Sequence, residues 1–187
     1  SYKVGFFKEI APNFNIRGNH STGYKNRTLY TLEEQSNSNE LNFDYHDFTL
    51  SLFQTDVGDL NTDGIELSYN IDNFTLYGSH LNSKKKDTVQ LRRPNWNFGI
   101  MHNTALPDDY NLITNYNFKG EHLDIHNSNW STISMPETHL LDLGITKNYY
   151  NYEFGVSINN LLDEDYEAPH GFNQNGRSLN LVFKRSF

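Results

Sequence analysis

The chain has 187 residues and a formal net charge of −8, so it offers no dominant basic face to a nucleic-acid partner. It contains no cysteine, which excludes a disulfide framework, a thiolate metal site and a cysteine nucleophile. No apolar run reaches the roughly 18 residues of a transmembrane helix, and the opening SYKVGFF lacks the charged and apolar blocks of a signal peptide, so an exported protein would be represented by its mature form or a piece of it.

Apolar and polar residues alternate along most of the chain, which is the period of a β-strand with two different faces. Aromatic residues make up 14% of the sequence and favour strands over helices. The clearest case is the last segment, where Leu179, Leu181, Phe183 and Phe187 fall on one face. In chain order the alternation predicts about eleven strands, at residues 2–8, 14–22, 40–46, 48–57, 64–71, 74–82, 96–101, 110–126, 141–146, 152–159 and 179–187.

The connections between these segments alternate in length. Short turns with Asn, Asp, Pro or Tyr are predicted at 11–13, 46–47, 72–73, 107–109 and 148–150. Long polar connections are predicted at 23–39, 83–93, 127–137 and 160–175, and only 58–62 is short on that side. Short turns on one side and long loops on the other are typical of outer-membrane barrels, whose short turns are periplasmic. Residues 1–187 are therefore predicted to form one antiparallel transmembrane β-barrel domain.

A soluble sandwich or Greek-key barrel is the alternative, because it also contains many short alternating strands. In a sandwich the apolar faces pack against each other, and nothing requires its loops to alternate in length. The two architectures therefore make opposite predictions for the leucines and phenylalanines. In the membrane barrel they point outward to lipid, and in the sandwich they form a dry core.

Four stretches, in order, resemble TonB-dependent outer-membrane receptors: NHSTGYKNRTLYTL from Asn19, TDGIELSYNI from Thr62, QLRRPNWNFGI from Gln90, and INNLLDEDYEAPHGFNQNGRSLNLVFKRSF from Ile158. The last resembles the family's C-terminus, an Asn-Leu-Leu-Asp motif followed by Gly-Arg and a final aromatic-ended strand. In that final strand Leu179, Leu181, Phe183 and Phe187 resemble the signal that the barrel assembly machinery reads.

The resemblance implies a receptor for a scarce nutrient, such as a ferric siderophore or a cobalamin, in the outer membrane of a Gram-negative cell. The family's barrel has 22 strands around an N-terminal plug. About eleven strands without a plug predict a fragment, the C-terminal half of such a barrel. A small passive porin or a surface-binding barrel remains an alternative. Arg185 departs from the pattern because it occupies an outward position, although it lies near enough to the end to reach the headgroups.

The family transports rather than catalyses, so no catalytic residue and no cofactor are expected. Ligand contacts are expected from aromatic and polar residues of the long loops, namely Tyr24, Lys25, Arg27, Tyr30, Arg92, Arg93, Trp130, His170, Phe172 and Asn173. The expected partners are outer-membrane lipid and lipopolysaccharide, the barrel assembly machinery, a small-molecule nutrient, and TonB acting through the missing plug. Nucleic acid is not expected.

Three other patterns carry possible chemistry. His122, Asp124 and His126 would share one face of a strand, but alternate residues lie nearly 7 Å apart, too far to share one ion without a bend. A metal site is therefore not predicted there. His126 and Ser128 suggest a lipid hydrolase only if a third group orients them, and the same spacing argues against it. Lys84, Lys85 and Lys86 form a basic run that could meet lipopolysaccharide phosphates or simply be solvated.

Overall fold

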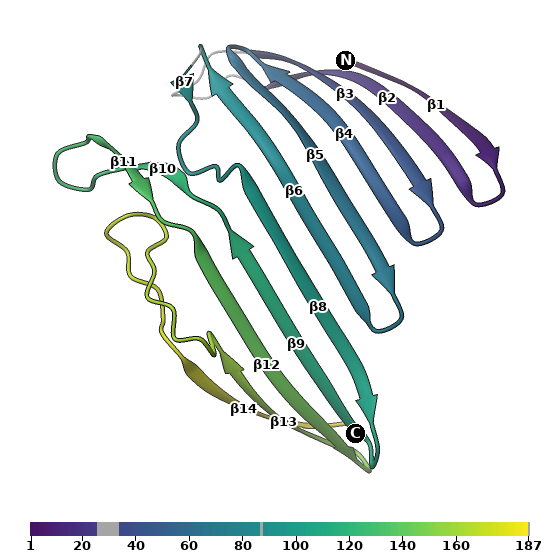
Figure 1. Ribbon diagram of the computed structural model, residues 1–187, viewed down its shortest axis with the longest axis vertical. Helices are drawn as coiled ribbons and strands as arrows, with labels where there is room; N and C mark the ends of the chain where they lie inside the picture. The colour runs from purple at the N-terminus through teal and green to yellow at the C-terminus, as the bar shows by residue number, and fades with distance from the viewer. Residues whose placement is uncertain (26–33, 87, 187) are drawn as a thin grey trace.

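A computed structural model describes residues 1–25, 34–86 and 88–186, and in these ranges the chain is built of β-strands (Figure 1). No helix in the described ranges has the length and apolarity needed to span a membrane. The strands are β1 (Tyr2–Ala11), β2 (Phe14–Lys25), β3 (Glu34–Tyr45), β4 (Phe48–Val57), β5 (Leu60–Ile71), β6 (Phe74–Lys85), β7 (Thr88–Val89), β8 (Trp96–Leu106), β9 (Tyr110–Lys119), β10 (His122–Ile125), β11 (Thr132–Met135), β12 (Thr138–Tyr149), β13 (Tyr152–Asn159) and β14 (Ser178–Arg185).

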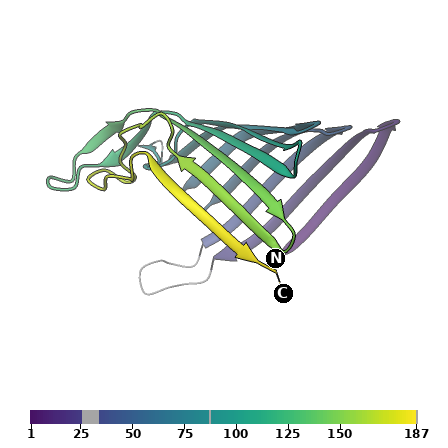
Figure 2. The same cartoon turned by 90° about the horizontal axis from the view of Figure 1, so that it is seen from below.

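Twelve of these strands form one antiparallel sheet whose order follows the chain, except that β7, β10 and β11 lie outside the main path. Its path runs β1-β2-β3-β4-β5-β6-β8-β9-β12-β13-β14, while β7 pairs only with Lys84 and Lys85 at the end of β6. The separate hairpin β10–β11 lies off this path. The predicted all-β, antiparallel meander is confirmed, and the path contains the eleven expected strands. Figure 2 shows that the sheet curls strongly instead of lying flat.

The alternation of connection lengths is also confirmed. The short turns between β1 and β2, β3 and β4, β5 and β6, β8 and β9, and β12 and β13 lie at one end of the sheet (Figure 1). The longer connections lie at the other end, together with the short β4–β5 turn at residues 58–59, which is the expected exception. Ser186 donates its backbone N–H to Asn151 O at 2.8 Å, so the end of β14 lies beside the β12–β13 turn. The short-turn end is called the lower end below, and the opposite end the upper end.

Several predicted boundaries are wrong, and two of them change the arrangement most. Residues 110–126 do not form one strand, because the ladder with β8 ends at Lys119 and the chain then turns into the β10–β11 hairpin. Gly120 closes that ladder by donating its N–H to Trp96 O at 2.8 Å. The predicted loop 23–39 is much shorter, since β2 and β3 pair as far as Lys25 and Glu34. Polar residues continue that ladder because its backbone hydrogen bonds need no apolar side chains.

The strand register separates two faces. One cross-strand row joins Ile16, Phe43, Leu50, Leu67 and Phe98, and rows of the same parity define the apolar face. The alternate parity defines the polar face, for example the row of Arg17, Asn42, Ser51, Glu66 and Ser79. The sheet therefore has one apolar and one polar face, as period-two alternation requires.

The apolar face is exposed and the polar face is the more shielded one. Ile65 and Leu67 are 46% and 38% exposed, whereas Asn42 and Ser83 on the polar face are nearly buried. Side chains on the inside of a curved sheet crowd together, so the polar face is the inner side. Among the described residues Met135 is the only buried hydrophobic residue. This arrangement contradicts a soluble sandwich, which would bury its leucines and phenylalanines.

Aromatic and cationic side chains mark the lower end of the apolar face. Tyr152 stacks on Phe183 with ring centroids 5.6 Å apart, and Lys147 Nζ lies 4.3 Å from the centroid of Tyr110. The Arg185 guanidinium lies 5.6 Å from the centroid of Tyr152. Aromatic rings with snorkelling cations are typical of the boundary between hydrocarbon and headgroups. The outward Arg185 is thus accommodated at the lower rim.

Candidate functional site

Three long connections meet at the upper end of the sheet, around the side chain of Asp124 in β10. Arg92, from the β7–β8 connection, donates its Nε–H to Asp124 Oδ1 at 2.5 Å. The backbone N–H of His170, from the β13–β14 connection, donates to Asp124 Oδ2 at 2.9 Å. Ile125 donates its own backbone N–H to Asp124 Oδ1 at 2.7 Å. One carboxylate therefore holds together three segments that are far apart in the sequence.

The environment of Asp124 keeps it ionised. Its side chain is completely buried, and burial alone would raise the pKa. The hydrogen bonds from the His170 amide, the Arg92 side chain and the Ile125 amide outweigh burial and lower the pKa to about 2. Buried carboxylates with several charge-assisted donors remain charged in this way. We call Arg92, Asp124, Ile125 and His170 the loop junction.

Further contacts tighten the loop junction. Arg92 donates its backbone N–H to Leu123 O at 2.6 Å, so the β7–β8 connection is fixed by backbone as well as side chain. His170 Nδ1 lies 2.7 Å from Glu167 Oε2, and the His126 and His170 rings are 4.9 Å apart. The last connection is therefore attached to the β10–β11 hairpin by a ring contact as well as by the Asp124 carboxylate.

Several of the predicted ligand residues belong to this assembly. Arg92 and His170 are brought together as members of the loop junction. Trp130, on the β10–β11 turn, and Phe172, after His170, are 78% and 63% exposed. The loop junction fixes these loops, so their solvent-exposed aromatic rings are available to contact a ligand. Arg93 is exposed next to Arg92, and Asn173 forms an isolated bridge with Glu167.

The remaining predicted ligand residues are not brought to the loop junction. Tyr24 lies near the upper end of β2 with 59% of its surface exposed, on a different part of the sheet. The backbone of Lys25 pairs with that of Glu34 in the β2–β3 ladder. Arg27 and Tyr30 lie outside the described residues.

The sequence reasoning missed a second junction, at the Asn-Leu-Leu-Asp motif. The nearly buried Asn160 donates Nδ2–H to Glu164 O at 2.8 Å and accepts from Glu164 N at 2.8 Å. Its own N–H donates to Asp142 Oδ1 at 2.9 Å. Arg177 closes the loop by donating Nε–H to Leu161 O at 3.0 Å. The motif therefore fixes both ends of the last long connection to the sheet.

The possible metal and hydrolase patterns find no support. His122 and Asp124 are buried on β10, but His126 lies beyond the strand, and no group of three His, Asp or Glu in the described residues could hold a metal ion. Burial and the nearby Lys119 charge lower the pKa of His122. Ser128 Oγ lies 3.0 Å from His126 Nδ1, and the Ser128 N–H points at the same nitrogen at 3.2 Å. The expected unfavourable spacing of His126 and Ser128 is therefore wrong, because the two residues lie in a turn and not on an extended strand. No hydrogen bond among the described residues orients the other ring nitrogen of His126, so the third group that a hydrolase requires is not found there.

The predicted assembly signal lies on the last strand of the sheet. Leu179, Leu181 and Phe183 are 64%, 75% and 63% exposed, and β14 pairs only with β13 among the described strands. Phe187 lies outside the described residues. The three described residues share the apolar face, as the alternation predicts.

Together the fold and the loop junction define the class of protein. It is an antiparallel barrel wall with one apolar and one polar face, with short turns at the lower end and hydrogen-bonded loops at the upper end. The chain is similar to the barrel of Fiu, the ferric-catecholate import receptor of E. coli K12, with a TM-score of 0.80, 14% identity, and coverage of 99% of this chain and 34% of that one. It is also similar to the ferripyoverdine receptor of the outer membrane of Pseudomonas aeruginosa, with a TM-score of 0.80, 14% identity, and coverage of 97% and 32%.

The FrpB iron transporter of Neisseria meningitidis is a third similar structure, with a TM-score of 0.76, 12% identity, and coverage of 97% and 38%. The chain thus spans about a third of the length of each of these proteins. No family model and no curated protein matches the sequence. The structural likeness confirms the predicted fold, that of the barrel of TonB-dependent receptors.

Proposed function

We propose that this chain forms the C-terminal part of the barrel of an outer-membrane receptor that imports a ferric siderophore. The observation that supports it most is the combination of an exposed apolar face with a polar inner face along a chain that follows the receptor barrels over nearly its whole length. The neighbours named for a substrate are iron receptors or transporters, which favours an iron chelate over the cobalamin that the sequence resemblance also implied.

In this proposal the sheet acts as the wall and the loop junction as the outer mouth. A bulky chelate is recognised by exposed aromatic rings and polar groups that are held in place before binding, because a pre-organised loop loses less entropy on binding. Trp130 and Phe172 supply the rings, and Arg93 supplies a cation for an anionic chelate. The resemblance assigns gating to a plug and release to TonB, both outside this chain.

A passive porin is less well supported. It needs an even number of strands and a closed ladder. The path in the described residues contains eleven strands, and β1 and β14 each have a single neighbour. Both also run from the upper to the lower end (Figure 1), so pairing them with each other would make a parallel ladder. The geometry therefore calls for further strands between them.

The test uses the full-length protein in its own cell. Deletion of the gene should abolish uptake of radiolabelled iron presented as one class of ferric siderophore, and loss of TonB should have the same effect. A Trp130→Ala, Phe172→Ala double variant should weaken uptake, while the outer-membrane level of the protein stays unchanged. TonB-independent uptake, or a protein absent from the outer-membrane fraction, would refute the proposal.

A further inference from the structure

The sequence contains one Asn-Gly pair, Asn175–Gly176, and one Asp-Gly pair, Asp63–Gly64. In both pairs a side-chain carbonyl precedes a backbone N–H that no side chain of its own residue shields, because glycine has no Cβ. In such a pair the glycine nitrogen can attack the side-chain carbonyl carbon and form a cyclic imide. The reaction in a folded protein depends on how freely the two groups can approach each other. The two pairs differ sharply in this respect.

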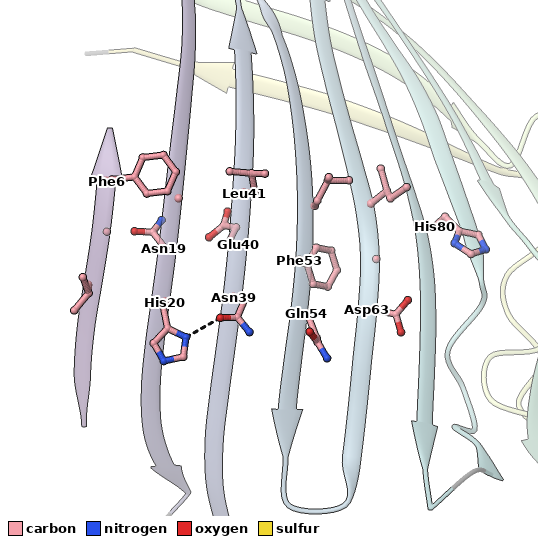
Figure 3. A pocket seen from close by; sticks show the side chains of 16 residues that line it. Phe6, Asn19, His20, Asn39, Glu40, Leu41, Phe53, Gln54, Asp63 and His80 are labelled. Carbon is pink, nitrogen blue, oxygen red and sulfur yellow. Dashed lines mark hydrogen bonds between the residues drawn. The ribbon is translucent and has the colours of Figure 1, made fainter. Parts of the chain in front are cut away.

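Asp63 and Gly64 are held within the ladders of β5. Gly64 pairs with both neighbouring strands, β4 and β6, so its backbone groups belong to the sheet. Figure 3 shows Asp63 on this strand across from Gln54 of β4. Asp63 Oδ1 accepts a hydrogen bond from Asn82 Nδ2 at 3.2 Å. Imide formation would have to pull Gly64 out of the sheet, so this pair is protected.

Asn175 and Gly176 lie in the connection between β13 and β14, where both residues are exposed. The Asn175 carboxamide and the Gly176 N–H form no hydrogen bond with any residue in the described part of the chain. Neither residue belongs to a strand. Both reacting groups are therefore in solvent, and no hydrogen bond to either of them has to break before they meet.

The residues on either side of this pair are fixed. Gln174 donates its backbone N–H to a carbonyl of the same connection at 3.0 Å, and Arg177 donates its backbone N–H to Asp163 Oδ1 at 2.8 Å. The Asn175 carbonyl accepts from Asn160 Nδ2 at 3.4 Å. A chemical change in the pair therefore takes place inside the second junction, between its fixed points.

We propose that Asn175 is a site of spontaneous deamidation in the folded protein, and that its product loosens the last long connection. The Gly176 nitrogen loses its proton and forms a bond to Asn175 Cγ, the Cγ–Nδ2 bond breaks, and ammonia leaves with that proton. Water then opens the cyclic imide at one of its two carbonyls and gives aspartate or isoaspartate. Water is the only co-reactant, and nothing is oxidised or reduced.

The product carries a negative charge beside Asp163. Asp163 Oδ1 lies 3.1 Å from the position that a Cβ at Gly176 would occupy, so this carboxylate faces the pair. Like charges this close repel each other, and the new carboxylate competes for Arg177, whose N–H binds Asp163. Isoaspartate also adds one carbon to the main chain between Asn160's hydrogen bond and that of Arg177. Both changes weaken the second junction.

The loosened connection also reaches the loop junction. It carries His170, whose backbone N–H binds Asp124, and the exposed ring of Phe172. Deamidated copies of the protein should therefore hold this part of the upper end less firmly than fresh copies. The effect on ligand binding rests on the proposed function, whereas the chemistry at Asn175 does not.

The test follows Asn175 by peptide mass spectrometry in the full-length protein, kept folded in outer membranes at physiological temperature. We expect a growing fraction in which an oxygen atom replaces an NH group, and an isoaspartyl methyltransferase should methylate the isoaspartate in it. Asn175→Gln should stop the conversion, because the longer side chain closes the imide ring less readily. Asp63→Asn is the matched control, since it places a second Asn-Gly pair within the ladders of β5. That pair should convert only after unfolding.

Hydrogen exchange over residues 160–177 measures the loosening. It should be about fivefold faster in aged protein and in Asn175→Asp, the equivalent of one hydrogen bond, and unchanged in Asn175→Gln. An Asn175 that stays intact in the folded protein, although it converts after unfolding, would overturn the site. Equal conversion of the two pairs in the folded protein would overturn the role of the fold, and unchanged exchange would overturn the loosening. None of these results depends on iron import, which is tested separately.

Discussion

Asp124 shows how one side chain organises a surface built from distant segments. Its carboxylate accepts hydrogen bonds from Arg92, His170 and Ile125, although the sequence places the first two far from it. An amide in its place keeps the shape but loses the charge and turns one acceptor into a donor facing other donors. The loop junction is therefore the part of the mouth most sensitive to a single substitution.

We expect Asp124→Asn to loosen the β10–β11 hairpin without unfolding the sheet. Loss of the buried charge-assisted bonds costs about 1–3 kcal/mol locally, so amide exchange over residues 122–135 should become about five- to 150-fold faster. Hydrogen exchange measured by mass spectrometry in the full-length protein checks this. Asp47→Asn, at an exposed position in the β3–β4 turn at the lower end, serves as the control, and equal exchange in both variants would contradict the assignment.

The pH dependence of the junction follows from the same residue. Because the folded pKa of Asp124, about 2, lies below the ordinary value of about 3.9, its stabilisation is complete above that ordinary value. It is lost as the pH falls through about 3.9 toward 2. Limited proteolysis at the hairpin should therefore be constant from neutral pH down to about 5 and should increase below about 4. Increased cleavage already at pH 6 would point to a histidine instead.

At the scale of elements, strand alternation assigns each residue to lipid or to the interior. Leu67 and Ser68 are neighbours on β5, the first on the apolar face and the second on the polar face. An arginine at the lipid face costs about 2–4 kcal/mol near the bilayer midplane, whereas the inner face accepts polar groups. The two positions therefore provide a matched pair with opposite expectations.

We predict that Leu67→Arg lowers the amount of folded, heat-modifiable protein in the outer membrane several-fold, and that Ser68→Arg does so much less. Semi-native gels of outer-membrane fractions measure both variants of the full-length protein. If the serine variant were the more damaging of the two, the assignment of the faces would be reversed.

At the scale of the whole molecule, the described sheet has two edges that no described strand covers. Every residue of β1 is exposed, and β14 pairs on one side only. Unpaired N–H and C=O groups at a sheet edge cannot be left in hydrocarbon, so the sheet needs further strands to span a membrane. The same edges favour edge-to-edge association in water.

We therefore expect residues 1–187, expressed alone, to give aggregates and no heat-modifiable monomer in detergent. The full-length protein should give one. Semi-native electrophoresis after refolding distinguishes the two results. A folded monomer of the isolated segment would show that the edges close without additional strands, and it would favour the small-barrel alternative.

The sequence by itself determined the class of this protein. Alternation is a local property, so the eleven strands, their two faces and the short lower turns could be predicted from residues a few positions apart. Strand ends were less accurate, because polar side chains let β2 and β3 continue above the apolar belt, and because Gly120 ends a pattern that runs on to His126.

Only the tertiary structure decided what the polar residues do. The sequence could select Arg92 and His170 as loop residues, but not their meeting at Asp124, because that contact depends on where curvature places the ends of distant strands. The same holds for the hydrogen bonds of Asn160 and for the contact between the His80 and Trp96 rings. Local pattern fixes the face of each residue, whereas register and curl fix its neighbours.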